Sequence, residues 1–114
     1  MKTVRDNLDI NDNNSVMLFA TPHCNPCKNM KMILEDLEST HSDKANFYYI
    51  NTEANELLTK KYNIKSVPTT VFKNGNKIKD RFAGFIDTVD LESKLMNLLF
   101  DFDGEMDSFN DFDL

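Results

Sequence analysis

A five-residue apolar run, followed at once by a helical pattern, is the feature that most limits how this chain can fold. The run, VMLFA at residues 16–20, is typical of a strand buried on both faces of a parallel sheet. Pro22 follows it, and from Pro26 onward apolar residues recur with helical spacing, at Met30, Ile33, Leu34 and Leu37. Pro26 suits the first turn of a helix, where its missing N–H would have no partner anyway. The segment therefore predicts a buried strand, a short loop and an amphipathic helix.

Two further strands and a short helix are predicted in the middle of the chain. Residues 47–50 and 69–72 are apolar, aromatic or β-branched, which favours strands. Leu57, Leu58 and Tyr62 indicate a short helix between residues 53 and 63. Residues 6–14 are polar and rich in Asn, and they are expected to form a weak helix or a loop.

The sequence of the last third of the domain predicts a hairpin and a final helix. Asn74-Gly75-Asn76 is a strong signal for a tight turn, and Ile78 and Phe82 are expected to share one face of the returning strand. The final helix is marked by four leucines and by a cap at Asp87 or Thr88; the leucines are Leu91, Leu95, Leu98 and Leu99. The predicted fold class is α/β, with a mixed central sheet and helices on both faces.

Charge divides the 114 residues into two parts. Residues 1–100 carry 13 basic and 13 acidic residues, whereas residues 101–114 carry six acids and no base. A neutral body and an acidic tail predict no binding to nucleic acid. We expect residues 1–100 to form one domain and residues 101–114, with scattered Phe and no periodic core face, to be disordered.

The remaining composition restricts the location of the protein. No apolar stretch approaches the roughly 18 residues that a membrane span needs, so no membrane association is expected. The first 14 residues are charged and lack the apolar stretch of a secretory signal. Two cysteines in such a chain do not make a secreted disulfide scaffold. These observations predict a cytoplasmic protein.

The two cysteines lie where a thiol becomes reactive. Cys24 and Cys27 stand between the buried strand and the predicted helix. Unpaired N–H groups at the start of a helix favour negative charge, which lowers the pKa of the first thiol from about 8.5 toward 7. Lys28 adds to this field. Cys27, about one turn inside the helix, is the less accessible thiol, and it can attack a mixed disulfide formed on Cys24.

Three other readings of the pair stay open on the residues alone. A structural disulfide would close a very small loop and would constrain the unfolded chain little. A zinc site would need two more ligands, for which the chain offers only His23 and His41, so no metal is expected. The two cysteines could also be unreactive, because C-x-x-C alone has a real rate of chance occurrence.

Four segments make the sequence resemble the thioredoxin family. They are Cys24-Asn25-Pro26-Cys27-Lys28, the segment YNIKSVPT at residues 62–69, the segment FKNG at residues 72–75, and Gly84. The resemblance spans roughly residues 15–100 without an insertion between these segments. It implies the thioredoxin fold, a central mixed sheet flanked by helices on both faces.

The resemblance also implies roles for individual residues. Cys24 would be the nucleophile and Cys27 the resolving thiol. Pro68 would follow a cis peptide bond, although an X-Pro bond in general is cis only about 5–6% of the time. Val67 would offer its backbone to an extended substrate segment, and Gly84 would keep the neighbouring surface open.

Three departures from the family pattern bear on the site. His23 stands where thioredoxins usually have Trp, so the contact surface beside the nucleophile changes and a titratable ring takes its place. Leu18 stands where the family has a buried aspartate that handles the proton of the resolving thiol. Asn25 replaces a glycine and reshapes the loop before Pro26. The reaction type is expected to survive these changes.

The resemblance implies a protein-disulfide reductase that acts by thiol–disulfide exchange. It needs no bound cofactor, takes its electrons from an NADPH-dependent thioredoxin reductase, acts on disulfide-containing proteins and is a monomer. Two alternatives remain. The approach to Cys24 through Pro22 and His23 suits a glutaredoxin-like enzyme recycled by glutathione, although Phe85 rather than a second glycine follows Gly84. The chain could instead be a binding subunit that is held to a partner by its acidic, Phe-bearing tail.

Overall fold

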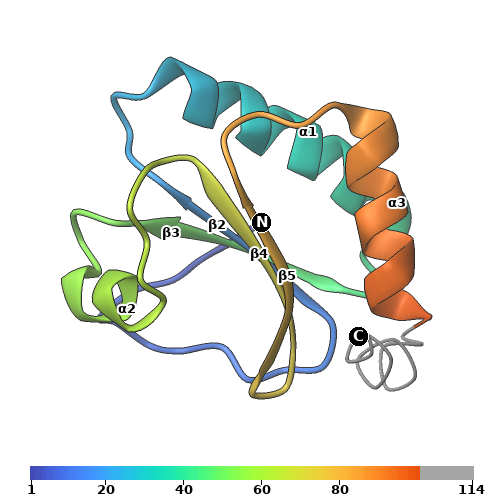
Figure 1. Ribbon diagram of the computed structural model, residues 1–114, viewed down its shortest axis with the longest axis horizontal. Coiled ribbons are helices and arrows are strands. Elements are labelled where there is room, and N and C mark those ends of the chain that lie inside the picture. The colour runs from blue at the N-terminus through green and yellow to red at the C-terminus, as the bar shows by residue number, and fades with distance from the viewer. Residues whose placement is uncertain (101–114) are drawn as a thin grey trace, which may run out of the picture.

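The computed structural model describes residues 1–100, and Figure 1 shows their arrangement. The strands are β1 (Lys2–Thr3), β2 (Ser15–Ala20), β3 (Asn46–Asn51), β4 (Thr69–Asn74) and β5 (Lys77–Ala83). The helices are α1 (Asn25–His41), α2 (Glu56–Lys61) and α3 (Thr88–Leu99). Among residues 1–100, no helix is both long enough and apolar enough to cross a bilayer.

The five strands form one mixed sheet in the order β1-β3-β2-β4-β5. β1 and β2 each pair with β3 in parallel, whereas β4 pairs antiparallel with both β2 and β5. All six residues of β2 are buried, as expected for a central strand covered on both faces. This arrangement confirms the predicted α/β class and the mixed sheet.

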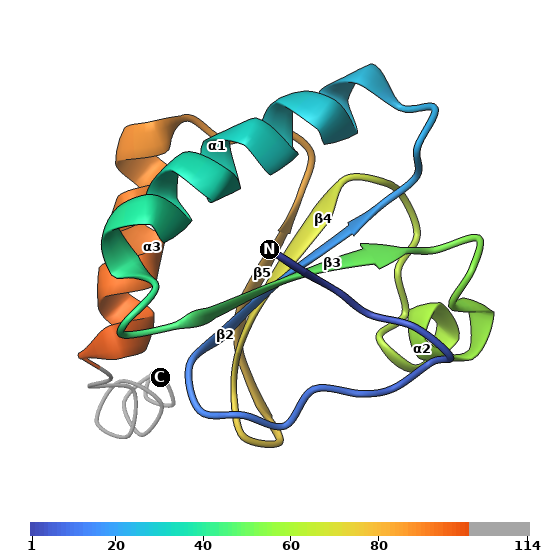
Figure 2. The ribbon, with the colours of Figure 1, turned by 180° about the vertical axis from the view of Figure 1, so that it is seen from behind.

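Helices cover both faces of the sheet. α1 and α3 pack on one face, over a core that includes Leu18, Leu34 and Leu95. α2 and the N-terminal segment pack on the other face, over a second core that includes Phe19 and Leu58. The two layers are visible on opposite sides of the strands in Figure 1 and, from behind, in Figure 2.

The N-terminal segment differs most from what its sequence suggests. β1 has only two residues and carries no strand pattern, so it was not predicted. Residues 6–14 form a loop rather than a helix, and Asp6, Asn7 and Asn14 adopt positive φ angles. Asn and Asp tolerate that conformation better than other residues with side chains. Their abundance here is therefore a loop signal.

The β4–β5 hairpin turns as predicted but contains an irregularity. Phe72 pairs with Asp80 and Lys73 pairs with Ile78, so one extra residue enters β5 between Ile78 and Asp80. Such a bulge reverses the faces of the residues on its two sides. Ile78 consequently lies on the α2 side, near Lys73, while Phe82 lies on the α1 and α3 side. The expectation that Ile78 and Phe82 share a face is wrong for this reason.

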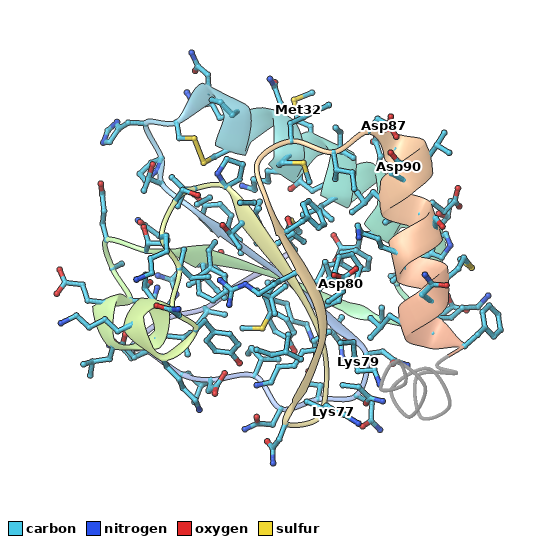
Figure 3. All side chains as sticks on the ribbon, in the orientation of Figure 1. Met32, Lys77, Lys79, Asp80, Asp87 and Asp90 are labelled. Carbon is cyan, nitrogen blue, oxygen red and sulfur yellow. A yellow bond between two sulfur atoms is a disulfide. The ribbon has the colours of Figure 1, made fainter. Side chains whose placement is uncertain are left out.

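The final helix is capped at its start and is joined to the sheet by an ion pair from its middle. Asp87 is its N-cap, and its carboxylate accepts a hydrogen bond from the Asp90 N–H at 2.9 Å. Lys94 forms an ion pair with Asp80 of β5, with 2.8 Å between Nζ and Oδ2. Figure 3 shows Asp80 between β5 and α3, and Asp87 and Asp90 at the start of α3.

Candidate functional site

The loop between β2 and α1 places the two cysteines. Cys24 is the N-cap of α1, and its Sγ accepts a hydrogen bond from the Cys27 N–H at 3.1 Å. Pro26 lies in the first turn, where it removes no intrahelical hydrogen bond. The sulfur of Cys24 therefore sits where the N–H groups of α1 are unpaired and the helix dipole favours a thiolate.

Cys24 and Cys27 are joined by a disulfide, with 5.2 Å between their Cα atoms. The bond is drawn at the start of α1 in Figure 3. Cys27 is 2% exposed and belongs to the core under α1, whereas Cys24 is only partly buried. An attacking group from solvent therefore reaches Cys24 first.

The strand register brings Pro68 and Gly84 to the same end of the sheet. Phe19 pairs with Thr69, and Thr69 pairs with Ala83, so Pro68 and Gly84 lie beside the end of β2. The Val67–Pro68 peptide bond is cis, as the family resemblance implied. Gly84 has φ +87°, and its N–H donates to the Pro68 carbonyl at 2.8 Å.

Val67 is partly buried and packs against the same core as Cys24. It also lines a surface cavity of about 220 Å³ that begins at the loop before Cys24. The other lining residues are Thr21, Thr52, Thr59, Ile64, Lys65 and Ser66. Val67 can therefore be reached from solvent through this cavity.

The remaining predicted site residues surround the cysteines at the surface. His23, Asn25, Pro26 and Lys28 are all exposed. Lys28 continues the helix, since its N–H donates to the Cys24 carbonyl at 3.2 Å. The structure thus groups every predicted site residue at one end of the sheet.

Leu18 has no exposed surface and lies in the core under α1. Its partners in the sheet are Tyr49 on β3 and Thr70 on β4. The hydroxyl of Thr70 is buried, and it has no hydrogen-bond partner within residues 1–100. This layer of the sheet therefore holds apolar and neutral side chains at the position where the thioredoxin pattern has a buried carboxylate.

Two residues near Cys27 were missed from the sequence. Lys31 and Tyr49 line a second surface cavity together with Cys27. The signal for Lys31 was available, because residues four apart on a helix lie on the same face. Tyr49 could be placed only once the pairing of β3 with β2 was known.

Within residues 1–100, no group of three or more His, Cys, Asp or Glu side chains is arranged to hold a metal ion. The family model for thioredoxin matches residues 2–97, which include both cysteines, Pro68 and Gly84. The chain belongs to the thioredoxin family. The match covers all five strands, α1, α2 and α3 except for its last two residues.

Known thioredoxins resemble this one over most of the domain. Thioredoxin-1 of Drosophila melanogaster is 34% identical over 84 residues, which are 74% of each chain. A thioredoxin of Alicyclobacillus acidocaldarius is 32% identical over 82 residues, covering 71% of this chain and 77% of the relative. The crystal structure of the germline-specific thioredoxin Deadhead of Drosophila melanogaster matches with a TM-score of 0.70 and 33% identity. That match covers 76% of this chain and 82% of the other.

Other relatives are longer proteins. The M-type chloroplastic thioredoxin of Pisum sativum is 33% identical over 92 residues, which are 79% of this chain and 53% of the relative. Thioredoxin M4 of Arabidopsis thaliana is 32% identical over 81 residues, which are 71% of this chain and 42% of the relative. This thioredoxin therefore spans about half the length of these chloroplastic relatives.

Proposed function

We propose that this thioredoxin is a protein-disulfide reductase that works by thiol–disulfide exchange through Cys24 and Cys27. The observation that carries the proposal is the pair itself. The partly buried Cys24 caps α1, and the buried Cys27 lies one turn behind it, within bonding distance. One sulfur can meet a substrate while the other stays protected from it.

The reaction follows from this difference in exposure. The Cys24 thiolate attacks one sulfur of a substrate disulfide, forms a mixed disulfide and releases the first substrate thiolate. The Cys27 thiolate then attacks Cys24 Sγ, and the Cys24–Cys27 bond forms as the Cys24–substrate bond breaks. Each released thiolate takes a proton from water. The substrate gains two electrons, and the two cysteines lose them.

Substrate binding is assigned to the surface around Cys24. The Val67 backbone offers hydrogen bonds to an extended segment, and the cavity beside it leaves room for that segment. No neighbouring heavy atom lies within 4 Å of a Cβ built on Gly84, so this part of the surface is open. His23 supplies the contact beside the nucleophile, and Asn25, Pro26 and Lys28 shape the loop and its charge.

The electron supply is part of the same proposal. A dithiol that has been oxidised needs a reductant, and the family resemblance points to an NADPH-dependent thioredoxin reductase. Residues 1–100 are the catalytic unit, acting as a monomer in the cytoplasm on disulfide-containing proteins. The balanced charge of that unit suits protein substrates rather than nucleic acid.

Insulin reduction tests the activity, with precipitation of the freed insulin chain as the readout. We expect turnover by the wild type with dithiothreitol as reductant, and a loss of at least 100-fold for Cys24→Ser, because the nucleophile is removed. Cys27→Ser should accumulate mixed disulfides on Cys24, visible by mass spectrometry. Wild-type protein that neither reduces insulin nor forms such adducts as Cys27→Ser would contradict the proposal.

A second arm of the assay identifies the physiological reductant. NADPH with thioredoxin reductase is expected to sustain turnover, and glutathione with glutathione reductase is expected to sustain little. The reverse result would assign this chain to the glutaredoxin-like alternative. A double Cys24→Ser, Cys27→Ser variant that retains full function in cells would support the binding-subunit alternative instead.

A further inference from the structure

A surface cavity beside Cys27 is the feature that the proposed reaction leaves unexplained. It has a volume of about 220 Å³, enough for several water molecules. Its lining comes from the loop after β2, from α1 and from β3. The residues are Thr21, Pro22, Cys27, Lys28, Lys31 and Tyr49. Cys27 thus borders a surface cavity that neither Cys24 nor Val67 lines.

Lys31 is held at this cavity by two constraints. It lies four residues after Cys27 on α1, so the two side chains are neighbours on one helix face. Its ammonium group lies 4.8 Å from the centroid of the Tyr49 ring, in a cation–π contact. Lys31 and Tyr49 also line another surface hollow, of about 370 Å³, which is distinct from the cavity of Cys27 and lies next to the N-terminal segment. The pair therefore stands between two surface hollows.

A positive charge near Cys27 would favour the resolving step. Cys27 must lose its proton before it can attack, and burial in an apolar core raises the pKa of a thiol. Leu18, in the sheet layer under α1, offers no carboxylate to take the proton. A nearby ammonium group opposes the effect of burial, because it favours the thiolate.

We propose that Lys31, held over Tyr49, stabilises the Cys27 thiolate across this cavity, and that water in the cavity carries the released proton to solvent. This inference rests on the proposed function. Lys31 is a positioning residue in this scheme, since it acts on the thiolate through the cavity. The proton goes to water, and the electron pair left on Cys27 Sγ forms the new bond to Cys24.

The other ionisable groups around Cys27 are compatible with this role. Burial, followed by the nearby Glu53, raises the pKa of Tyr49, so its hydroxyl stays neutral. Glu53 itself is exposed and does not line the cavity of Cys27. Lys28 on α1 contributes a second positive charge at the cavity, and the exposed His23 lies in the loop before Cys24. The carboxylates at the start of α3, Asp87 at its N-cap and Asp90 in its first turn, are exposed (Figure 3).

The test follows the reaction of Cys24 and the reaction of Cys27 as two separate kinetic phases. Reduced protein is mixed with excess dithiobis(nitrobenzoate), an aromatic disulfide whose coloured thiolate is released once by Cys24 and once more when Cys27 resolves the adduct. Both phases are followed by stopped flow from pH 5 to pH 10. The variants are Lys31→Met, Lys31→Arg and, as a matched control, Lys2→Met. Lys2 makes the same kind of contact with Tyr48, at 5.7 Å, but does not line the cavity of Cys27.

We expect Lys31→Met to raise the pH midpoint of the second phase by about half a unit to one unit. Below that midpoint the second phase slows by about three- to tenfold, while the first phase changes by less than about twofold. Lys31→Arg keeps the charge and should restore the wild-type midpoint, and Lys2→Met should match the wild type.

An unchanged midpoint in Lys31→Met would overturn the inference and leave the proposed function standing. An equal slowing of both phases would overturn it as well, because that result indicates a general effect on α1. A wild-type protein that shows a first phase and no second phase would overturn the proposed function itself.

Discussion

Lys73 is a buried cation on the face of the sheet opposite the cysteines. It is 3% exposed, and its Nζ donates to the Ile10 carbonyl at 2.7 Å and to Asn11 Oδ1 at 3.2 Å. It also contacts the Tyr62 hydroxyl and lies 3.5 Å from Asp9 Oδ1. A buried charge is tolerated only when such partners surround it. Lys73 therefore ties the N-terminal loop to β4.

Asp9→Asn tests this cluster through pH. Burial raises the pKa of Asp9, but hydrogen bonds from Lys61, Tyr62 and the Ile10 N–H, together with the positive charge of Lys73, outweigh burial and bring it down to about 2. The carboxylate therefore stabilises the fold fully above its ordinary pKa of 3.8, and this contribution is lost as the pH falls toward 2. We expect the variant to be less stable by about 2 kcal/mol at pH 7, and the difference to shrink below pH 4.

Urea unfolding between pH 2 and pH 7 provides the measurement for Asp9→Asn. Asp43→Asn is the matched control, since Asp43 is an exposed acid in the turn after α1. The control should change the free energy of unfolding by less than about 0.5 kcal/mol at every pH. A constant deficit of Asp9→Asn from pH 7 down to pH 2 would show that the carboxylate charge is not the stabilising feature.

At the level of single residues, the sequence predicts groups whose chemistry is local. Cys24 and Cys27 are recognisable because their spacing and the following helix are both visible in the sequence. Lys73 is not, because its burial depends on Asp9 and Tyr62, which lie 64 and 11 residues away. Tyr49 is hidden for the same reason, since its position beside Leu18 is set by strand pairing.

At the level of elements, the β4–β5 turn depends on one glycine. Gly75 has φ +61°, and it is the only one of the two turn residues with a positive φ, as in a type II′ hairpin. A Cβ added at Gly75 meets no neighbouring heavy atom within 4 Å, so its cost is conformational. We expect Gly75→Ala to lower the free energy of unfolding by about 1 kcal/mol, measured by thermal or urea unfolding.

Asn76→Ala is the control for the turn, since Asn76 is the other turn residue and has no positive φ. It should change stability by less than about 0.5 kcal/mol. An equal loss in both variants would mean that the turn is held by side-chain contacts rather than by the backbone conformation of Gly75.

Elements with a clear pattern of apolar residues are predicted well from this sequence. Elements that are very short, or whose pattern is interrupted by a bulge, are not. α1 and β2 each show one clear pattern over much of their length. β1 has two residues, too few for any pattern, and it is a strand only because β3 is beside it. The bulge in β5 is likewise fixed by how β5 pairs with β4, so the alternation read from Ile78 to Phe82 fails.

At the level of the whole molecule, the excess of negative charge comes entirely from a segment outside the described residues. The prediction that residues 101–114 are disordered concerns this segment, which lies outside the described residues. Removing these residues brings the formal net charge from −6 to zero. We expect the 1–100 chain to keep its rate of insulin reduction and its unfolding midpoint. Its solubility minimum should move from about pH 4.8 toward neutral pH, because net charge keeps proteins apart.

Insulin reduction, thermal unfolding and solubility against pH check this truncation. The matched control is the full chain with the six acids of residues 101–114 changed to their amides, which removes the charge and keeps the length. A truncated chain that loses activity or unfolds earlier would show that residues 101–114 belong to the working domain. Full activity in vitro with lost function in cells would favour a tail that binds a partner.

Because of the extra residue in β5, side chains at positions 78 and 82 point to opposite faces of the sheet, so the two positions suit different attachments. A dye or an immobilisation tag attached at position 78 would project on the α2 side, away from the layer that carries the thiols. The same attachment at position 82 would enter the layer beneath α1 and α3, where Phe82 packs against Phe72 with ring centroids 6.2 Å apart. An electrode-bound or bead-bound form of the protein is therefore best anchored near the hairpin tip.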